Sequence, residues 1–443
     1  MIPRLLMPIW VFSAFSLAAL QAAPQRGTAV SVPEGFPLSA WLTQKEISQI
    51  YWRVYVSKPY FRPDLRQELT VTAHFETKDT TTSDATHDVV MFARALENGR
   101  AVGPIHSVSL LDEQRRMEEL YPKITEKRSR PQLTTLEMIG LVRPGKFRLE
   151  LALLDRTTGR YSTKFENVTI DASKGDPLQP AFQELSKFEF VPRAKPEERD
   201  LAELIDLPIS ERGGTLIISN KPFTRLQARS HGESADLPTF VVNRSRPMHL
   251  SIIALLTPPE GAVGVAGYTY QFQESLIHIL SAMIRLRVTE GSATLTGIDL
   301  AERKRVFDNQ DLHEIDPDTL RTAIRKDLTT TTLSSMAGMT GNARFITDLL
   351  AESFVRAEQD TSGAEHTFIV VGTRTALGKD SPASLPAASC RCKVHYIRFF
   401  VEQGRDDIEK LLINYKPQLY EPRSWPEFRE QFGRIYEQLQ LQN

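Results

Sequence analysis

Two cysteines and a histidine near the C-terminal end are the residues of this sequence best suited to chemistry. Cys390 and Cys392 enclose one arginine, and His395 follows in the same short segment. Thiolates and imidazoles bind metals, and paired thiols carry out redox chemistry. A fourth metal ligand is missing nearby, and Lys393 adds positive charge. We therefore favour an incidental or structural cysteine pair over a metal site or a redox-active pair.

A group of carboxylates in the C-terminal half is a second candidate. Five of them fall within eleven residues: Asp308, Asp311, Glu314, Asp316 and Asp318. Calcium binds such oxygens, but the glycine that an EF-type turn needs is absent. Asp316 precedes Pro317, which is the pattern of a helix start. The group is therefore predicted to be a solvated loop and helix start, with calcium binding as the alternative.

A loop after an apolar run is the third candidate. The run from Leu250 to Leu256 ends in Thr257-Pro258-Pro259-Glu260-Gly261, and a helical pattern begins near Gln271. In open α/β sheets, ligands bind where the chain leaves the carboxyl end of such a strand. This loop has one carboxylate, no phosphate-binding glycine pattern and no nucleophile–base pair. The sequence therefore predicts where a ligand would bind, but no specific activity.

The elements that would position this loop alternate between strand and helix over residues 246–443. Strands are expected at 249–256, 293–300, 304–307, 366–372 and 393–400, and helices at 271–287, 317–327, 342–358, 406–414 and 424–440. The runs 250–256 and 367–371 are apolar on both faces, as are central strands of a parallel sheet. The pattern predicts a doubly wound, Rossmann-like α/β domain of three layers.

Residues 60–175 have a different pattern, with a period of two interrupted by turns. This predicts an antiparallel β-sandwich. In the run Phe147–Leu153 the apolar residues should face the core, while Arg148 and Glu150 should face water. The charged, proline-rich segment 176–245 is expected to be a linker with connecting strands.

A short amphipathic helix is expected before the sandwich, over residues 39–57. Ile47, Ile50 and Val54 recur at helical spacing, and Thr43 followed by Glu46 fits a capping box at the start.

The first 22 residues have the pattern of a secretory signal peptide. Arg4 is followed by an uncharged apolar stretch from Leu5 to Leu20 and then by Gln21-Ala22-Ala23. A membrane anchor is the alternative, but the stretch contains Pro8 and is shorter than the roughly 20 residues that a span needs. We expect export to the periplasm or the cell exterior after cleavage, with no transmembrane segment in the mature chain.

The overall composition excludes some classes of partner. The 443 residues contain 54 Lys and Arg against 55 Asp and Glu. This balance argues against a nucleic-acid partner, which would require a basic surface. The length and the 41% hydrophobic content predict a globular protein of two or three domains.

The order of elements after residue 246 resembles a von Willebrand factor type A (VWA) domain, in particular the divergent VWFA-related type of secreted acidobacterial proteins. The matching segments are RPMHLSIIALL for the first strand, SATLTGIDLAERKRVFDNQ for a hairpin of the second and third, DPDTLRTAIRK for a short helix, GMTGNARFITDLLAESFVRA for a loop and helix, EHTFIVVGTRTA for the fourth strand and CKVHYIRFF for the fifth. The upstream LVRPGKFRLELALLDRTTGRYS is similar to the sandwich strands that precede such domains.

The departures from the family pattern concern its metal site. Members that bind a divalent cation carry Asp-x-Ser-x-Ser after the first strand, a threonine in the second loop and an aspartate after the fourth strand. The corresponding loops here offer Thr257, Glu260, Thr340, Asn342, Thr373 and Arg374. Arg374 would repel a cation, which needs clustered anionic oxygens. We expect no metal and no cofactor, and we take these six residues as a candidate binding surface.

The favoured interpretation is an exported, non-enzymatic binding protein, whose partner is a protein or an envelope polymer. One alternative is a secreted hydrolase or redox enzyme that uses the Cys390/Cys392 region or a metal in the acidic group. Another is a structural envelope component in which the sandwich is the main part. The sequence does not indicate the oligomeric state.

Overall fold

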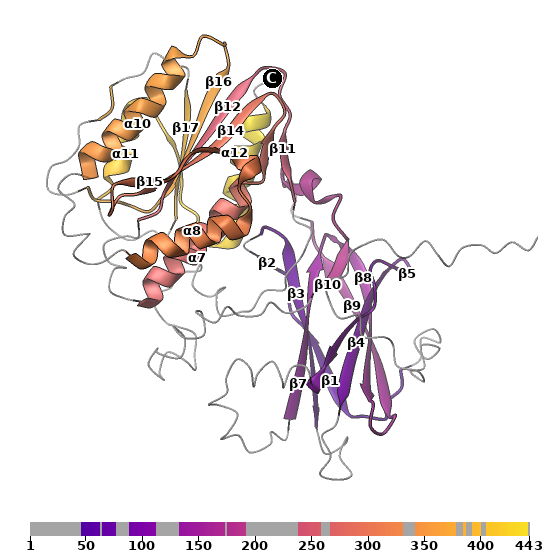
Figure 1. Cartoon of the computed structure of the whole chain (residues 1–443). Helices are drawn as coiled ribbons and strands as arrows, with labels where there is room; N and C mark the ends of the chain where they lie inside the picture. The colour runs from indigo at the N-terminus through magenta and orange to yellow at the C-terminus, as the bar shows by residue number, and fades with distance from the viewer. Residues whose placement is uncertain are drawn as a thin grey trace, which may run out of the picture.

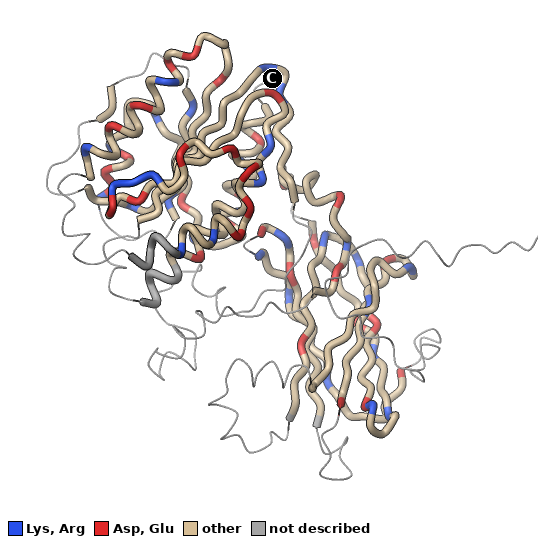
Figure 2. The backbone as a smooth tube through the Cα atoms, viewed as in Figure 1, with Lys and Arg blue, Asp and Glu red and all other residues tan. Residues whose placement is uncertain are grey.

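The computed structural model describes residues 46–62, 64–76, 88–111, 133–172, 175–191, 238–257, 266–330, 342–377, 384–386, 392–399 and 405–441. These residues form an all-β part and a mixed α/β part (Figure 1). Positive and negative side chains are interspersed along both parts (Figure 2). Among the helices of the described segments, none is both long and apolar enough to cross a membrane.

The all-β part consists of two antiparallel sheets. Its strands are β1 (Trp52–Val56), β2 (Tyr60–Phe61), β3 (Gln67–Glu76), β4 (Val89–Glu97), β5 (Arg100–Ala101), β6 (His106–Ser109), β7 (Leu133–Val142), β8 (Gly145–Asp155), β9 (Tyr161–Ile170) and β10 (Phe188–Val191). One sheet has the order β1-β3-β7-β10 with β2 beside β3, and the other has the order β5-β4-β8-β9 with β6 beside β4. Alternate residues of both sheets, such as Val71 of β3 and Leu151 of β8, fill one shared core. This is the sandwich arrangement expected from the period-two pattern.

Glu150 of β8 is buried, so the prediction that it faces water is wrong. Only 1% of the residue is exposed. Arg94 lies directly opposite on β4, and its Nε donates to Glu150 Oε2 at 2.5 Å. Opposite charges in a cross-strand pair stabilise each other, and this allows the carboxylate to leave the solvent.

The helix predicted over 39–57 is wrong within the described residues of that range. Trp52–Val56 form β1, which pairs antiparallel with β3. Along this strand Trp52 is buried, while its neighbour Arg53 and then Tyr55 are exposed. This alternation of aromatic and β-branched residues favours a strand, and it outweighs the helical spacing of a few apolar residues nearby.

The segment 176–245, predicted to be a linker, contributes to both parts of the protein. A 3₁₀ turn, η2 (Gln179–Phe182), precedes β10, and β10 pairs with β7 of the sandwich. Further along, β11 (Phe240–Val242) pairs in parallel with β13 (Leu286–Val288). The sandwich therefore extends to residue 191, beyond the predicted boundary at 175.

The α/β part is built around a six-stranded sheet. Its elements in chain order are β12 (Met248–Leu255), α7 (Ala266–Met283), β14 (Gly291–Asp299), β15 (Lys304–Asp311), η4 (Leu312–Glu314), α8 (Pro317–Thr330), α10 (Asn342–Gln359), β16 (Glu365–Gly372), β17 (Lys393–Arg398), α11 (Asp407–Leu412), η5 (Ile413–Tyr415), β18 (Gln418–Tyr420) and α12 (Trp425–Gln440). The strand order is β15-β14-β12-β16-β17-β18. Only β15 runs antiparallel to its neighbour, and the other pairs of this sheet are parallel.

Helices cover both faces of this sheet (Figure 1). Leu250 and Ile252 of β12 belong to the same core cluster as residues of α7, α8 and α12. Ile253 and Leu255 of the same strand belong to a second cluster, which they share with residues of α10 and α11. The central strand is therefore apolar on both faces because each face is covered by a helical layer.

The strands and helices predicted between residues 249 and 440 are present, with their ends shifted by a few residues. The largest difference lies at 271–287, because α7 ends at Met283 and the chain re-enters a strand at Leu286. Two short strands, β13 and β18, were not predicted. Each has three residues, which is too short to give a periodic pattern.

Arg429 of α12 joins the two parts. Its Nε and Nη2 lie 3.1 and 2.5 Å from Oδ2 of Asp176, and its Nη1 donates to the carbonyl oxygen of Leu65. The guanidinium also lies 4.9 and 4.4 Å from the ring centroids of Phe61 and Phe182. One largely buried cation thus contacts a carboxylate, a carbonyl and two aromatic rings of the preceding part.

Candidate functional site

The candidate site lies at the carboxyl edge of the six-stranded sheet, where β12 is flanked by β14 and β16. The strand order reverses at this point, which is where ligands bind in open α/β sheets. The ladder register brings Asp299, Leu256 and Thr373 into one row across the three strands. Asp299 and Thr373 therefore lie at the carboxyl ends of the two strands that flank β12.

Asp299 is the last residue of β14 and was not among the predicted site residues. It is fully buried. Its Oδ1 accepts hydrogen bonds from the backbone N–H groups of Ala301 and Glu302 at 2.8 and 3.2 Å. Its Oδ2 is buried without a hydrogen-bond partner. Burial raises the pKa of this carboxyl above its ordinary value.

Asn342, a predicted site residue, is the first residue of α10 and is 1% exposed. Its Oδ1 accepts a hydrogen bond from Nε of Arg303 at 3.0 Å, which ties the helix start to the turn after β14. Its Nδ2 is buried and has no partner. An amide donor is therefore available at the edge of the sheet.

Thr257 and Thr373, both predicted site residues, follow β12 and β16 and are also buried. Oγ1 of Thr257 accepts a hydrogen bond from the backbone N–H of Leu300 at 2.7 Å and so holds the ends of two strands together. The carbonyl oxygen of Thr373 accepts from the hydroxyl of Tyr396 at 3.2 Å. The hydroxyl of Thr373 has no partner.

Arg374 is half-buried and is paired. Its Nη2 lies 3.2 Å from Oε1 of Glu421, which follows β18. The same oxygen lies 2.5 Å from Nη2 of Arg398, and Arg398 also pairs with Asp406. Arg374 is therefore one member of an ionic network at the ends of three strands.

The remaining two predicted site residues, Glu260 and Thr340, lie outside the described residues. The structure thus brings Thr257 and Asn342 to the same edge as Thr373 and Arg374, and it adds Asp299. The sequence did contain a signal for Asp299, because it ends an apolar strand just as Thr257 does. The family pattern directed attention to the loops after the first and fourth strands and to the second loop, and not to the end of β14.

The other candidates from the sequence have local roles. Cys392 is disulfide-bonded, and the sequence contains one other cysteine, Cys390. In the acidic group, Asp308 pairs with Arg305. Asp311 and Asp316 cap the turns that follow them. Within the described part of the chain, no three His, Cys, Asp or Glu residues are arranged to hold a metal ion.

Three buried polar atoms without hydrogen-bond partners therefore lie at the carboxyl edge, on three separate elements: a carboxylate oxygen, an amide nitrogen and a hydroxyl. An unpaired buried polar group is unfavourable, and strain, a bound water or a functional role can account for one. Each of these atoms retains the capacity for one further hydrogen bond. With one carboxylate among them, they do not match the donor set of a divalent cation.

Comparison with protein-family models finds no match to this chain, and comparison with curated proteins finds none either. The assignment of function therefore depends on the geometry of the chain itself.

Proposed function

We propose that this protein is an exported, non-enzymatic binding protein with a VWA-like domain, and that the carboxyl edge of its sheet contacts a protein or an envelope polymer. The strand order supports the VWA-like part of the proposal. Numbered along the chain from β12, omitting the short β13, the strands lie in the order 3-2-1-4-5-6, which is a doubly wound arrangement. The second and third strands, β14 and β15, form an antiparallel hairpin, as the family resemblance implies.

The observation that carries the proposal is the group of unpartnered polar atoms at the switch point, on Asp299, Asn342 and Thr373. Beside them, the side chains of Arg374 and Glu421 are 29% and 28% exposed, so these charged groups are accessible to a partner at the same edge. The described part of the edge offers one carboxylate oxygen without a hydrogen-bond partner, and we propose that recognition proceeds through hydrogen bonds and the adjacent ion pairs.

A photo-crosslinking side chain at position 374 tests the proposal in the cell that produces the protein. We expect it to capture a discrete partner. The same side chain at position 355 is the matched control, because Val355 is 44% exposed on α10, away from the edge. Equal labelling from both positions, or none from position 374, would contradict the proposed site.

Arg374→Ala tests the same surface without a probe. We expect weaker capture of that partner, with the free energy of unfolding changed by about 1 kcal/mol or less. The stability change is small because Glu421 keeps its ion pair with Arg398 when Arg374 is removed. Binding assays and chemical denaturation of the same variant separate the two effects, and capture at the wild-type level would rule out a role for Arg374.

A redox function of the Cys390/Cys392 pair is the second candidate, because Cys392 is disulfide-bonded. It requires the bond to exchange with added thiols while the protein remains folded. Thiol labelling across a series of dithiol/disulfide ratios measures this exchange. A bond that opens only on unfolding is structural.

A further inference from the structure

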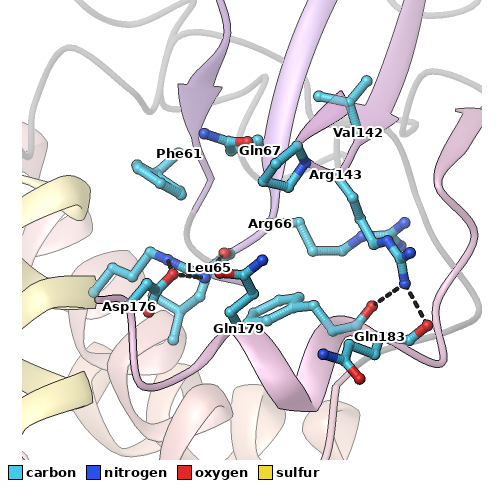
Figure 3. Close-up of a pocket in the computed structure, with 12 residues that line it drawn as sticks. Phe61, Leu65, Arg66, Gln67, Val142, Arg143, Asp176, Gln179 and Gln183 are labelled. Atoms are coloured by element: carbon cyan, nitrogen blue, oxygen red, sulfur yellow. Dashed lines mark hydrogen bonds and ion pairs between the residues drawn. The ribbon is translucent and has the colours of Figure 1, made fainter. Parts of the chain in front are cut away.

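The pocket beside the junction of the two parts is lined by residues that hold the parts together. It has a volume of about 390 Å³. At its wall Arg429 pairs with Asp176. Arg143 donates to the carbonyl oxygens of Phe182 and Leu185 at 2.9 and 3.1 Å, so its side chain lies against the η2 turn (Figure 3). These two arginines thus serve the junction, whereas the outer face of one sandwich sheet presents its polar and aromatic groups to solvent.

That outer face belongs to the sheet β1-β3-β7-β10, at the end where β1 lies. Along the chain the inward-facing Trp52 and Val54 alternate with Tyr51, Arg53 and Tyr55, which are exposed. The two tyrosines are 54% and 52% exposed, and both lie on the same side of the strand as Arg53. Tyrosine is enriched in binding surfaces because its ring is apolar and its hydroxyl is polar.

The neighbouring strands continue this face with polar side chains. The ladder register places His74 of β3 beside Arg53, and Thr72 beside Tyr55. The two rows continue onto β7. The name tyrosine face is used below for these four residues together with Tyr51, Thr135 and Glu137.

Contacts between these side chains fix the two tyrosine rings. Nε of Arg53 donates to the hydroxyl of Tyr51 at 3.0 Å. Hydrogen bonds with Tyr51 and Tyr55 raise the pKa of the guanidinium, so Arg53 holds both rings from the middle. The Tyr55 ring packs edge-on against His74, with centroids 5.3 Å apart, and Nδ1 of His74 lies 2.9 Å from Oγ1 of Thr135. Rings that are already ordered lose little conformational entropy when a ligand binds.

The composition of the tyrosine face distinguishes between classes of partner. Its two charged residues, Arg53 and Glu137, have opposite signs, which gives no net attraction for an acidic or a basic polymer. The centre of a protein–protein interface is usually apolar, whereas the central positions here are Thr72 and His74. Exposed rings beside hydroxyl, imidazole and guanidinium groups match a partner with small apolar surfaces framed by hydroxyl groups, and a sugar ring has this chemistry.

We propose that the tyrosine face binds a neutral polysaccharide chain. The apolar sides of its sugar rings stack on Tyr51 and Tyr55, and its hydroxyl groups form hydrogen bonds with Arg53 and Thr135. The two tyrosines are four positions apart, or roughly 13 Å along an extended chain, so an oligosaccharide reaches both rings and a single sugar reaches one. This site is separate from the carboxyl edge of the six-stranded sheet, and its failure would leave the proposal for that edge unaffected.

Affinity electrophoresis of the mature protein in native gels tests the proposal with three soluble neutral polymers: hydroxyethylcellulose, laminarin and galactomannan. We expect at least one of them to retard the protein relative to a polymer-free gel. Raised salt should leave the retardation unchanged, because no ion pair with the polymer is involved. A gel that contains alginate, an acidic polymer, is the comparison. Retardation by none of the neutral polymers, or by alginate alone, would overturn the proposal.

The double variant Tyr51→Ala/Tyr55→Ala removes both rings and should weaken binding of the retarding polymer about tenfold or more. Tyr51→Phe/Tyr55→Phe keeps the rings and should retain most of the affinity. Ile413→Ala, at a 59% exposed side chain of the α/β part, is the matched control and should bind as the wild type does. Tyr51→Ala alone leaves the contact between Tyr55 and His74 in place, so it tests stacking if the double variant does not fold. Wild-type retardation of the alanine variants would overturn the assignment.

Calorimetric titration with oligosaccharides of the polymer that binds tests the use of both rings. A six-unit chain should bind more tightly than a two-unit chain in the wild type, and this advantage should disappear in Tyr51→Ala. Equal binding of the two lengths by the wild type would contradict a site that extends over both tyrosines.

Discussion

At the scale of single residues, His395 on β17 is a buried titratable group that makes stability depend on pH. It is 2% exposed, and burial lowers the pKa of its imidazole to about 4. Its Nδ1 lies 3.3 Å from the hydroxyl of Tyr420, and its Nε2 has no partner. The folded protein therefore holds the ring neutral, whereas the unfolded chain protonates it below a pH of about 6.5.

A group whose pKa is lowered on folding in this way destabilises the protein in acid. The unfolded state binds the extra proton between about pH 6.5 and 4, so stability falls as the pH falls through this window. We expect His395 to account for about 2 to 3 kcal/mol of the loss by pH 4. Chemical denaturation at several pH values should show a shallower pH dependence for His395→Gln than for the wild type.

His74→Gln, at a partly exposed histidine on the outer face of β3, controls for the substitution itself. If the wild type and His395→Gln lose stability in parallel as the pH falls, the neutral, buried state of His395 is not the cause.

The predictability of the candidate site also depends on individual residues. The rule that ligands bind at the carboxyl ends of strands correctly brought Thr257, Asn342 and Thr373 to one edge. It did not indicate that Arg374 pairs with Glu421, because these residues are 47 positions apart and meet only when β16 to β18 align. The position of Asp299 at the end of an apolar strand could have been read from the sequence, but its buried oxygen without a partner is a property of packing that the sequence does not indicate.

At the scale of elements, a glycine of β7 makes room for an aromatic ring of its sheet neighbour β10. A Cβ on Gly140 would lie 2.9 Å from Cε1 and Cζ of Phe188, and 3.3 Å from Cδ1 of Leu69. The Phe188 ring in turn packs against Phe147 of the other sheet, with centroids 5.3 Å apart. The glycine therefore allows an aromatic contact across the sandwich.

Gly140→Ala should destabilise the protein by about 1 to 3 kcal/mol, because the Phe188 ring must move away from β7. Denaturant unfolding measures the change. In the double variant Gly140→Ala/Phe188→Leu, the clashing ring atoms are absent, so its destabilisation should be less than the sum of the two single effects. Strict additivity would show that the added methyl and the ring do not meet.

The sequence predicted long, periodic elements well and short ones poorly. Strands such as β12 and β16 are apolar runs bounded by turns, and their positions follow from composition. The first described strand, β1, has only five residues. Its sequence fits both a helical and a strand periodicity, and pairing with β3 stabilises the strand. The role of β10 as a sandwich strand could not be predicted because its partner β7 lies more than forty positions earlier and prolines surround it.

At the scale of the whole molecule, Arg429 couples the α/β part to the sandwich. Its side chain and that of Asp176 are 10% and 11% exposed, so the pair is largely desolvated. Removal of one partner leaves an uncompensated buried charge, which is strongly destabilising.

Arg429→Met should lower the stability of the junction by about 3 kcal/mol and separate unfolding into two transitions. Calorimetry measures the number of transitions. The double variant Arg429→Met/Asp176→Asn should recover part of this lost stability. The amide that replaces the carboxylate has no unpaired buried charge, and its side-chain oxygen can still accept a hydrogen bond from the backbone N–H of Leu178. A single transition at the wild-type temperature would show that the two parts are coupled elsewhere.

The contact between Arg429 and Leu65 spans 364 positions of the chain, and this separation affects the order of folding. The sandwich residues are synthesised long before α12, yet Leu65 and Phe182 share a core cluster with Phe428 and Phe432 of that helix. A chain that stops before Trp425 leaves these early residues exposed to solvent. Truncated products that lack α12 would therefore display an apolar surface that proteases and chaperones recognise.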